Sequence, residues 1–164
     1  MVIIMKNKET ICNSNLPEWA IGWLAGLIDG EGTITVKHHK RGNRYNYQPL
    51  IVINNTSLEL LNKIKEVVGC GTIAGHSISY TMKHSNWNRV WRLEIRGSFT
   101  VYTLLQQIYP YLIVKRRHAE IVMKICEENI RAYSTKKPAN LEYLEELTKQ
   151  LKQMTKRGKK SAVG

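Results

Sequence analysis

The chain has 164 residues and carries 25 Lys and Arg against 13 Asp and Glu, a formal net charge of +12. This length favours one compact domain, and so large a basic excess indicates a polyanionic partner, most often nucleic acid, the alternative being a charge that serves solubility alone. The longest apolar run, residues 19–28, is half a membrane span, and no secretory signal is recognisable, so we expect a soluble intracellular protein of cytoplasm, nucleoid or organelle with no membrane partner.

The cysteines and histidines give no metal-binding spacing. Cys12, Cys70 and Cys126 form no C-x-x-C pair, and we expect reduced thiols with structural roles. His38 and His39 are adjacent, so on a strand they would point to opposite faces. A zinc site is therefore not expected.

The first helix is predicted over residues 17–28, with Pro17 in its first turn and Gly30 and Gly32 at its end. Residues 33–39 then alternate between apolar and polar side chains, which predicts a half-buried strand. After a short turn, residues 45–54 are predicted to form a second strand.

A second helix is expected after Thr56 and Glu59, which have the spacing of a capping box. This helix ends at Gly69, and its apolar positions are Leu60, Leu61, Ile64 and Val68. Residues 72–83 and 88–95 then predict a hairpin, although the alternation within 72–83 is broken and leaves its register open to a bulge.

Three more helices complete the prediction. The first is capped by Ser98, ends at Pro110 and carries one apolar face of Val101, Leu104, Leu105 and Ile108. The second covers residues 116–133, with Ala119, Val122, Cys126, Ile130 and Tyr133 at helical spacing. After Pro138, the last is marked by Leu141, Leu144, Leu147, Leu151 and Met154. The fold class is therefore α+β, with an N-terminal extension over 1–16, one domain over 17–155 and a basic tail over 156–164 that we expect to be disordered.

The two predicted hairpins are expected to be purely cationic. Residues 33–57 and 72–93 contain no carboxylate, and a twisted sheet with such side chains fits a DNA major groove. The alternative is edge-strand lysines that prevent aggregation. The residues we predict to contact DNA are Thr33, Thr35, Lys37, His39, Arg41, Arg44, Asn46, Gln48, Lys83, Arg89 and Arg92.

The end of the first helix carries two acids, Asp29 and Glu31. The C-terminus of a helix is electrostatically negative, so acids there call for a compensating cation, and Glu31 together with a nearby backbone carbonyl could hold a divalent ion. The alternative is a solvated turn. On the same helix, Gly22, Ala25 and Gly26 would let a second copy approach closely and bring two Glu31 residues together.

Residues 24–32 read LAGLIDGEG and resemble the signature of the LAGLIDADG homing endonucleases, from which they differ at two of nine positions. Gly30 stands where the family has alanine, and Glu31 stands where it has its metal-binding aspartate. The predicted order of elements also matches the family's α-β-β-α-β-β-α core with a curved antiparallel DNA-binding sheet, here followed by an extra C-terminal helix.

The resemblance assigns roles residue by residue. Glu31 would bind the metal with the carbonyl of Gly30, while Asp29 would stabilise the pair of helices at the dimer interface. Lys115, at the end of residues 109–115, matches the basic residue near the scissile phosphate. Asn55 matches the residue that positions active-site water, with Asn54 as its rival.

A single copy of the motif resembles the homodimeric members, which recognise long, nearly palindromic double-stranded DNA. The implied reaction is metal-assisted hydrolysis of one phosphodiester in each strand, with Mg²⁺ as the expected ion and Mn²⁺ or Ca²⁺ able to replace it for binding. Two alternatives stay open: a maturase that acts on intron RNA with the same scaffold, and a dimeric DNA-binding protein without catalysis.

Overall fold

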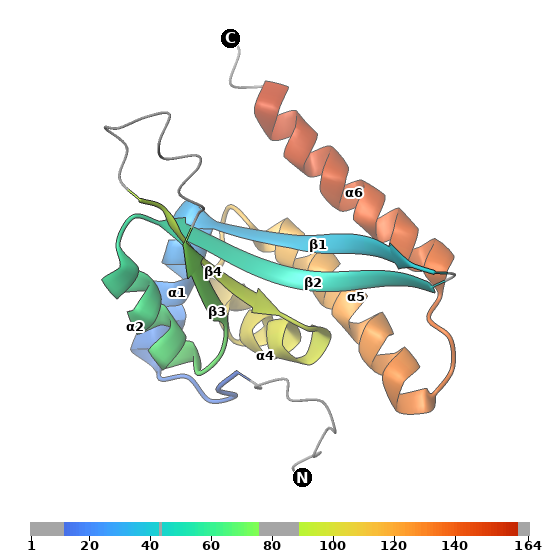
Figure 1. The fold of residues 1–164 in the computed structure, drawn as a ribbon, viewed down its shortest axis with the longest axis horizontal. Coiled ribbons are helices and arrows are strands. Elements are labelled where there is room, and N and C mark those ends of the chain that lie inside the picture. The colour runs from blue at the N-terminus through green and yellow to red at the C-terminus, as the bar shows by residue number, and fades with distance from the viewer. Residues whose placement is uncertain (1–11, 43, 76–88, 161–164) are drawn as a thin grey trace.

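The computed structural model describes residues 12–42, 44–75 and 89–160, with only the backbone described for Arg41, Arg44 and residues 156–160. The elements in chain order are α1 (Glu18–Glu31), β1 (Gly32–Arg41), β2 (Arg44–Asn55), α2 (Leu58–Val68), β3 (Thr72–Gly75), β4 (Trp91–Arg96), α4 (Ser98–Ile108), the 3₁₀ turn η1 (Tyr109–Tyr111), α5 (Arg116–Thr135) and α6 (Leu141–Lys160). This order confirms the predicted α+β class, an α-β-β-α-β-β-α core followed by a C-terminal helix (Figure 1).

The sheet is antiparallel and has the strand order β1-β2-β4-β3. Its register aligns Ile34 of β1 with Ile51 of β2 and Ile95 of β4, and all three side chains are buried. Because side chains alternate along a strand, this apolar row faces the core beneath the sheet, toward α1 and α5, which pass behind β1 and β2 in Figure 1. The opposite face, toward the viewer in Figure 1, is not covered by a helix among the described residues.

Two helix starts differ from the prediction. Ser57, not Thr56, caps α2, and its hydroxyl accepts a hydrogen bond from the Leu60 N–H at 3.2 Å. Gly97, not Ser98, precedes α4 as its N-cap. Ser98 is the first helical residue, and its hydroxyl accepts a hydrogen bond from Asn129 instead. The predicted end of α2 at Gly69 is confirmed, with this residue in the left-handed conformation at φ 76°.

The described end of the N-terminal segment, from Cys12 on, packs against the core. Cys12 and Leu16 are buried in the core, and the Asn13 N–H donates to the Val68 carbonyl at 2.8 Å. Cys12 also forms a disulfide with Cys70, so the expectation of reduced thiols was wrong for these two residues. Cys126 is free and buried, and burial raises the pKa of its thiol.

The last helix continues through Lys160, so regular structure extends past residue 156, where we expected the tail to begin. Its inward positions Leu144, Leu147 and Leu151 are buried, as the helical spacing predicts, whereas Leu141 at its start is exposed. Across the described residues, no helix combines the length and the apolar character that crossing a membrane requires.

Candidate active site and nucleic-acid-binding face

Two helix ends with electrostatically unfavourable charges meet in the structure. Helix α1 has no basic residue in its last turn and ends in Asp29 and Glu31. Helix α5 has no acidic residue in its first turn and begins with Arg116 directly after Lys115. Acids are disfavoured at a helix C-terminus and cations at an N-terminus, but here they compensate each other, because the Lys115 ammonium donates to the Asp29 carbonyl oxygen at 2.5 Å. The two acids led us to expect a compensating positive charge at this helix end. Lys115 supplies part of that charge.

The Asp29 carboxylate anchors the segment that carries Lys115. Its two oxygens accept hydrogen bonds from the Ile113 N–H at 2.7 Å and the Lys115 N–H at 2.9 Å. Burial favours a higher pKa for Asp29, but these backbone hydrogen bonds outweigh it and hold the pKa below its usual value. Asp29 therefore acts within its own chain, where it fixes the backbone of Lys115 against the end of α1.

Glu31 is paired with Asn55. The Asn55 Nδ2 donates to the Glu31 Oε2 at 2.5 Å, and the Asn55 Oδ1 accepts from the Ser57 N–H at 2.8 Å. Asn54 lies on the opposite face of β2, where its register partner is Arg92. The geometry therefore favours Asn55 over its rival as the residue beside the acid.

The junction between α1 and β1 requires a glycine at position 32. A Cβ at Gly32 would lie 2.8 Å from the Ile28 Cα, closer than a side chain allows. The Gly32 N–H also donates to the Ile28 carbonyl. This tight junction turns the chain into the sheet directly after Glu31 and leaves its carboxylate exposed at the end of the helix.

The donor set at this helix end fits a hard divalent cation. The structure gives Glu31 no hydrogen bond from the described residues other than that of Asn55, and the last carbonyls of a helix, including that of Gly30, lack intrahelical partners. Within residues 12–42, 44–75 and 89–160, no three His, Cys, Asp or Glu side chains gather into a metal-binding group. Mg²⁺ needs only one or two carboxylates, because it keeps water and takes phosphate oxygens.

Lys115 and His118 share a partly buried environment. Burial lowers the pKa of Lys115, and the negative charge of Asp29 partly opposes this shift. One turn further along α5, burial and the charge of Lys115 lower the pKa of His118. Its Nδ1 is buried and has no hydrogen-bond partner among the described residues. His118 was not among the residues predicted for the site, and its position three residues after Lys115 was the only signal.

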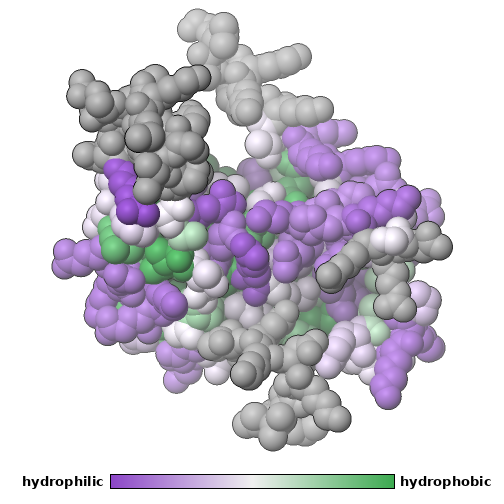
Figure 2. All heavy atoms as spheres, in the orientation of Figure 1, coloured by the Kyte–Doolittle hydropathy of each residue, from purple (hydrophilic) through white to green (hydrophobic). Residues whose placement is uncertain are grey.

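The open face of the sheet collects most of the residues predicted to contact DNA. Thr33, Thr35, Lys37 and His39 alternate along β1 with the buried Ile34 and Val36. Their register places Lys37 opposite Gln48 and His39 opposite Asn46. His38 points the other way, as predicted, and stacks on Tyr47 with ring centroids 4.6 Å apart. Figure 2 shows hydrophilic side chains across the middle of this face.

The remaining predicted contacts lie elsewhere. Arg92 is on the open face of β4, opposite Asn54, while the exposed Arg89 precedes this strand with its guanidinium 4.3 Å from the Trp91 ring centroid. The backbones of Arg41 and Arg44 pair at the end of the β1–β2 hairpin. Lys83 lies outside the described residues.

The prediction that both hairpins are purely cationic was wrong. Strand β4 contains Glu94, which is 8% exposed on the same face as Arg92. Its carboxylate accepts hydrogen bonds from the Arg92 Nε at 2.6 Å and the Lys37 Nζ at 3.4 Å, and it also pairs with Arg96. Alternation over residues 92–96 puts these three β4 side chains on one face, a signal that the sequence carries but that did not enter the prediction.

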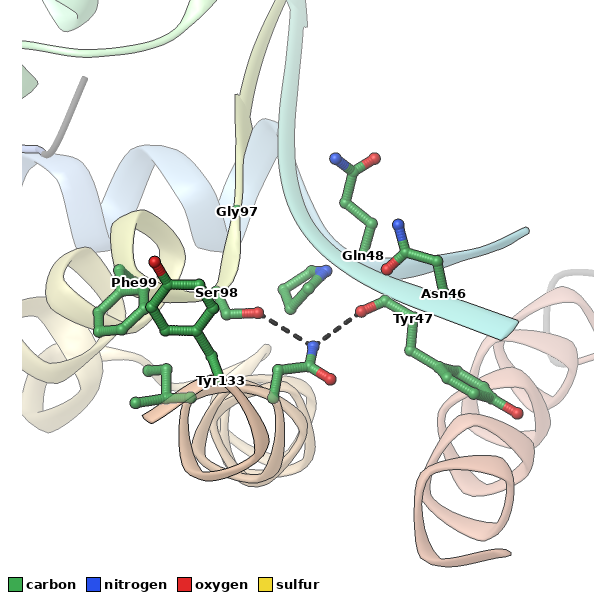
Figure 3. A pocket seen from close by; sticks show the side chains of 10 residues that line it. Asn46, Tyr47, Gln48, Gly97, Ser98, Phe99 and Tyr133 are labelled. Atoms are coloured by element: carbon green, nitrogen blue, oxygen red, sulfur yellow. Dashed lines mark hydrogen bonds between the residues drawn. The ribbon is translucent and has the colours of Figure 1, made fainter. Parts of the chain in front are cut away.

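A separate cavity of about 360 Å³ lies between β2, the start of α4 and the end of α5. Asn129 crosses it, and its Nδ2 donates to the Tyr47 carbonyl at 2.8 Å and to the Ser98 hydroxyl at 3.0 Å (Figure 3). Figure 3 also shows the side chains of Asn46 and Gln48 on the other side of β2 from Ser98 and Tyr133. The cavity does not include Glu31 or Lys115 among its lining residues.

Comparison with known proteins matches residues 24–107, just over half of the chain, to the sequence profile described as LAGLIDADG endonuclease. The chain is 35% identical over 113 residues to the intron-encoded DNA endonuclease aI3 of Saccharomyces cerevisiae, an alignment that covers 66% of this chain and 24% of that protein. It is 26% identical over 111 residues to the DNA endonuclease I-CvuI of Chlorella vulgaris, which covers 65% of this chain and 63% of that protein. The chain thus spans about a quarter of the first relative and under two thirds of the second.

Solved structures show the same fold. The homing endonuclease I-CvuI, in complex with DNA in the presence of magnesium, has a TM-score of 0.65 at 22% identity, over 82% of this chain and 80% of that one. The archaeal intron-encoded homing endonuclease I-Vdi141I, complexed with DNA, has a TM-score of 0.65 at 19% identity, over 85% of this chain and 84% of that one. I-CvuI was also solved with its target in the presence of calcium.

Proposed function

Because the chain belongs to the LAGLIDADG endonuclease family, we propose that it is a sequence-specific endonuclease that cuts both strands of DNA as a homodimer. Two contacts at the end of α1 carry this proposal: Asn55 donates to the Glu31 carboxylate, and Lys115 donates to the carbonyl of Asp29, two residues before Glu31. The exposed Glu31 at a helix C-terminus is electrostatically unfavourable and forms no ion pair with the described residues, which suggests that it serves chemistry and not stability. A maturase or a DNA-binding regulator has no need of this arrangement.

Each residue of the site has a distinct part in phosphodiester hydrolysis. Glu31 and the carbonyl of Gly30 would hold Mg²⁺, with Mn²⁺ or Ca²⁺ as substitutes in binding, and the ion would supply Lewis-acid stabilisation of the attacking and leaving oxygens. Asn55 keeps one oxygen of Glu31 in place and offers its amide to active-site water. The Lys115 ammonium stabilises negative charge that grows on the phosphate, and Asp29 fixes the backbone from which Lys115 projects.

The open face of the sheet would lie along the DNA. Its polar and cationic side chains on β1, β2 and β4 are those that read base edges and phosphates in a major groove. The relatives I-CvuI and I-Vdi141I were solved with DNA, and the shared fold supports the same partner here. We expect steep salt dependence, because each phosphate that a cation neutralises adds about −0.9 to the log–log slope.

The exposed strip of α1 supports dimerisation. Gly22, Gly26 and Gly30 follow one another at intervals of four residues, which places them on one helix face, and all three are exposed. Apart from the adjacent backbone of α1 itself, a Cβ at any of them would meet no atom within 4 Å, so packing within the described part of the chain does not require glycine there. A second α1 helix that packs closely would require it. Ala25 does not belong to this strip, because it is 1% exposed in the core of its own chain.

Exposed apolar side chains lie near both ends of α1. Trp19 on α1 is 61% exposed, and Ile113 and Val114 are 84% and 71% exposed beside the Asp29 anchor. Exposed apolar groups of this kind are typical of protein interfaces. A symmetric pair of α1 helices would bring the two Glu31 residues near the two-fold axis, with one site for each DNA strand.

The proposal is tested by selecting cleaved sequences from a randomised duplex library with the purified protein and Mg²⁺. We expect a nearly palindromic consensus that is cut once in each strand, and no cutting when the cation is chelated. Selective DNA binding without cutting in Mg²⁺ or Mn²⁺ would identify a regulator instead. Absence of DNA selectivity together with accelerated splicing of an intron RNA would identify a maturase.

A further inference from the structure

We propose that Glu94 is a positioning residue of the DNA-binding face, one buried carboxylate that holds three cations in register and thereby limits binding to DNA of unrelated sequence. This inference rests on the proposed DNA-binding function. It concerns recognition by the sheet and not the chemistry at Glu31.

Glu94 links distant parts of the open face. The Lys37 Nζ, which belongs to β1, reaches the Glu94 Oε1 at 3.4 Å although β2 lies between β1 and β4. The Arg92 Nε donates to the same oxygen at 2.6 Å, and Arg96 pairs with the other oxygen. Both carboxylate oxygens are therefore occupied, and the side chains of three cations converge on one point.

The surroundings make this cluster rigid at its base and open at its rim. Glu94 and its neighbours on the same face of β2, Leu50 and Val52, are all buried. The side chains of Lys37, Arg92 and Arg96 stay 38%, 33% and 52% exposed, which leaves them accessible to a ligand. Burial, followed by the charges of Arg96 and Arg92, lowers the pKa of Lys37, as expected for cations that are crowded together.

The charge balance suggests what Glu94 does. Three cations and one carboxylate leave a net charge of +2 on the cluster, enough to attract DNA. Cations held to a carboxylate cannot turn freely toward the nearest phosphate, so they present their N–H groups in a fixed register. Phosphate contacts add affinity without sequence information, whereas fixed donors can read base edges. Glu94 thus strengthens discrimination between DNA sequences and weakens binding that does not depend on sequence.

The test compares Glu94→Gln, which keeps the shape but raises the net charge of the cluster to +3, with Glu59→Gln. Glu59 is an exposed carboxylate on α2, so this control removes the same charge without touching the cluster. The full chain is titrated with its selected target and with an unrelated duplex of equal length over a range of salt concentrations. Thermal unfolding checks that each variant is folded.

For Glu94→Gln we expect roughly three- to tenfold tighter binding of the unrelated duplex, because one released cation adds about one phosphate contact. The slope of log affinity against log salt concentration should become steeper by about one. The ratio of specific to unrelated affinity should fall by a similar factor, whereas Glu59→Gln should keep it. Glu94→Asp retains the charge on a shorter side chain, so it should also lower the ratio but leave the salt slope unchanged.

Equal weakening of both duplexes by Glu94→Gln, or an unchanged ratio in both Glu94 variants, would overturn the inference and leave the proposed DNA-binding function intact. If the wild-type protein bound neither duplex with a steep salt dependence, the proposed function would fail as well, and this inference with it.

Discussion

Replacing Lys115 with methionine separates catalysis from binding most clearly. The change removes the ammonium that donates to the Asp29 carbonyl at 2.5 Å, but the two backbone hydrogen bonds to the Asp29 carboxylate do not depend on the side chain, so the segment should keep its position. An interaction that strengthens in the transition state affects turnover more than affinity. Loss of one such electrostatic contact typically costs about 10²-fold in rate or more. The affinity for DNA should fall by no more than the contribution of one phosphate contact.

The assay is single-turnover cleavage of the selected target with enzyme in excess, together with equilibrium binding in Ca²⁺. Arg116→Met is the matched control, because Arg116 is exposed with its guanidinium 4.9 Å from the Tyr109 ring centroid, and no hydrogen bond or ion pair joins it to Asp29. Cleavage by Lys115→Met within tenfold of wild type, or a larger loss in Arg116→Met, would refute the assignment of Lys115.

A pH profile gives a second readout for Lys115. Its pKa is lowered, mainly by burial, and the proposed role needs the protonated form. The wild-type cleavage rate should therefore be sustained at lower pH. It should decline as the pH rises through the pKa of Lys115, which lies below the pKa of an ordinary lysine. In Lys115→Met this decline should be absent from the residual rate.

The remaining predictions concern assembly, affinity and stability. Gly26→Leu should place a bulky side chain on the exposed strip of α1. It should reduce both the dimer content seen in sedimentation and the double-strand cleavage. A wild-type chain that stays monomeric at micromolar concentration and on DNA would contradict the proposed dimer. A dimer with ~10 phosphate contacts should lose several decades of affinity over a fourfold rise in salt, and a nearly flat response would contradict the role of the sheet. Glu128 accepts hydrogen bonds from Arg131 and the Asn140 N–H, which hold its pKa at about 2. Because solvent screens this pair at the surface, Glu128→Gln should lower the free energy of unfolding by only about 1 kcal/mol near neutral pH. A carboxylate whose pKa is depressed in the folded state stabilises the fold fully above the pKa of the unfolded state and progressively less as the pH falls toward 2. The stability difference between Glu128→Gln and wild type should therefore vanish over that range. The exposed Glu142→Gln should show neither effect in chemical denaturation.

The order of elements could be predicted because their signals are local. Apolar spacing placed α4 and α5, and alternation over residues 33–39 placed β1 with the correct face toward the core. Helix starts were less predictable. Thr56 and Ser57 are adjacent residues that can both cap a helix, and only the path of the chain out of β2 decides that Ser57 does so.

Contacts between distant parts of the chain could not be derived from spacing. The Cys12–Cys70 disulfide joins residues that are 58 positions apart, and three cysteines without a motif do not indicate which two meet. The Lys37–Glu94 pair likewise depends on the strand order β1-β2-β4-β3, which places the second hairpin beside β2 through its later strand.

The site was partly predictable for a physical reason. Two acids at the C-terminus of a helix are unfavourable on their own, and this local signal in the sequence indicates Glu31. Local reasoning could not identify the partners of these acids, because Asn55 and Lys115 approach α1 from elements that lie far along the chain. Only the resemblance to the family assigned these two residues to the site. Asp29 shows this limit most clearly: its carboxylate binds backbone N–H groups of its own chain, a role that no side-chain pattern indicates.

Glu31 is the residue proposed to hold the catalytic cation, and Glu31→Gln tests this role without a change in side-chain size. The amide keeps the size of the side chain and can still accept from Asn55, but it loses the charge that holds the cation. Because the proposal assigns most of the affinity to the sheet, we predict that the variant binds the selected target with an affinity near that of wild type. Its cleavage in Mg²⁺ should be abolished. Cleavage within tenfold of wild type would contradict the account.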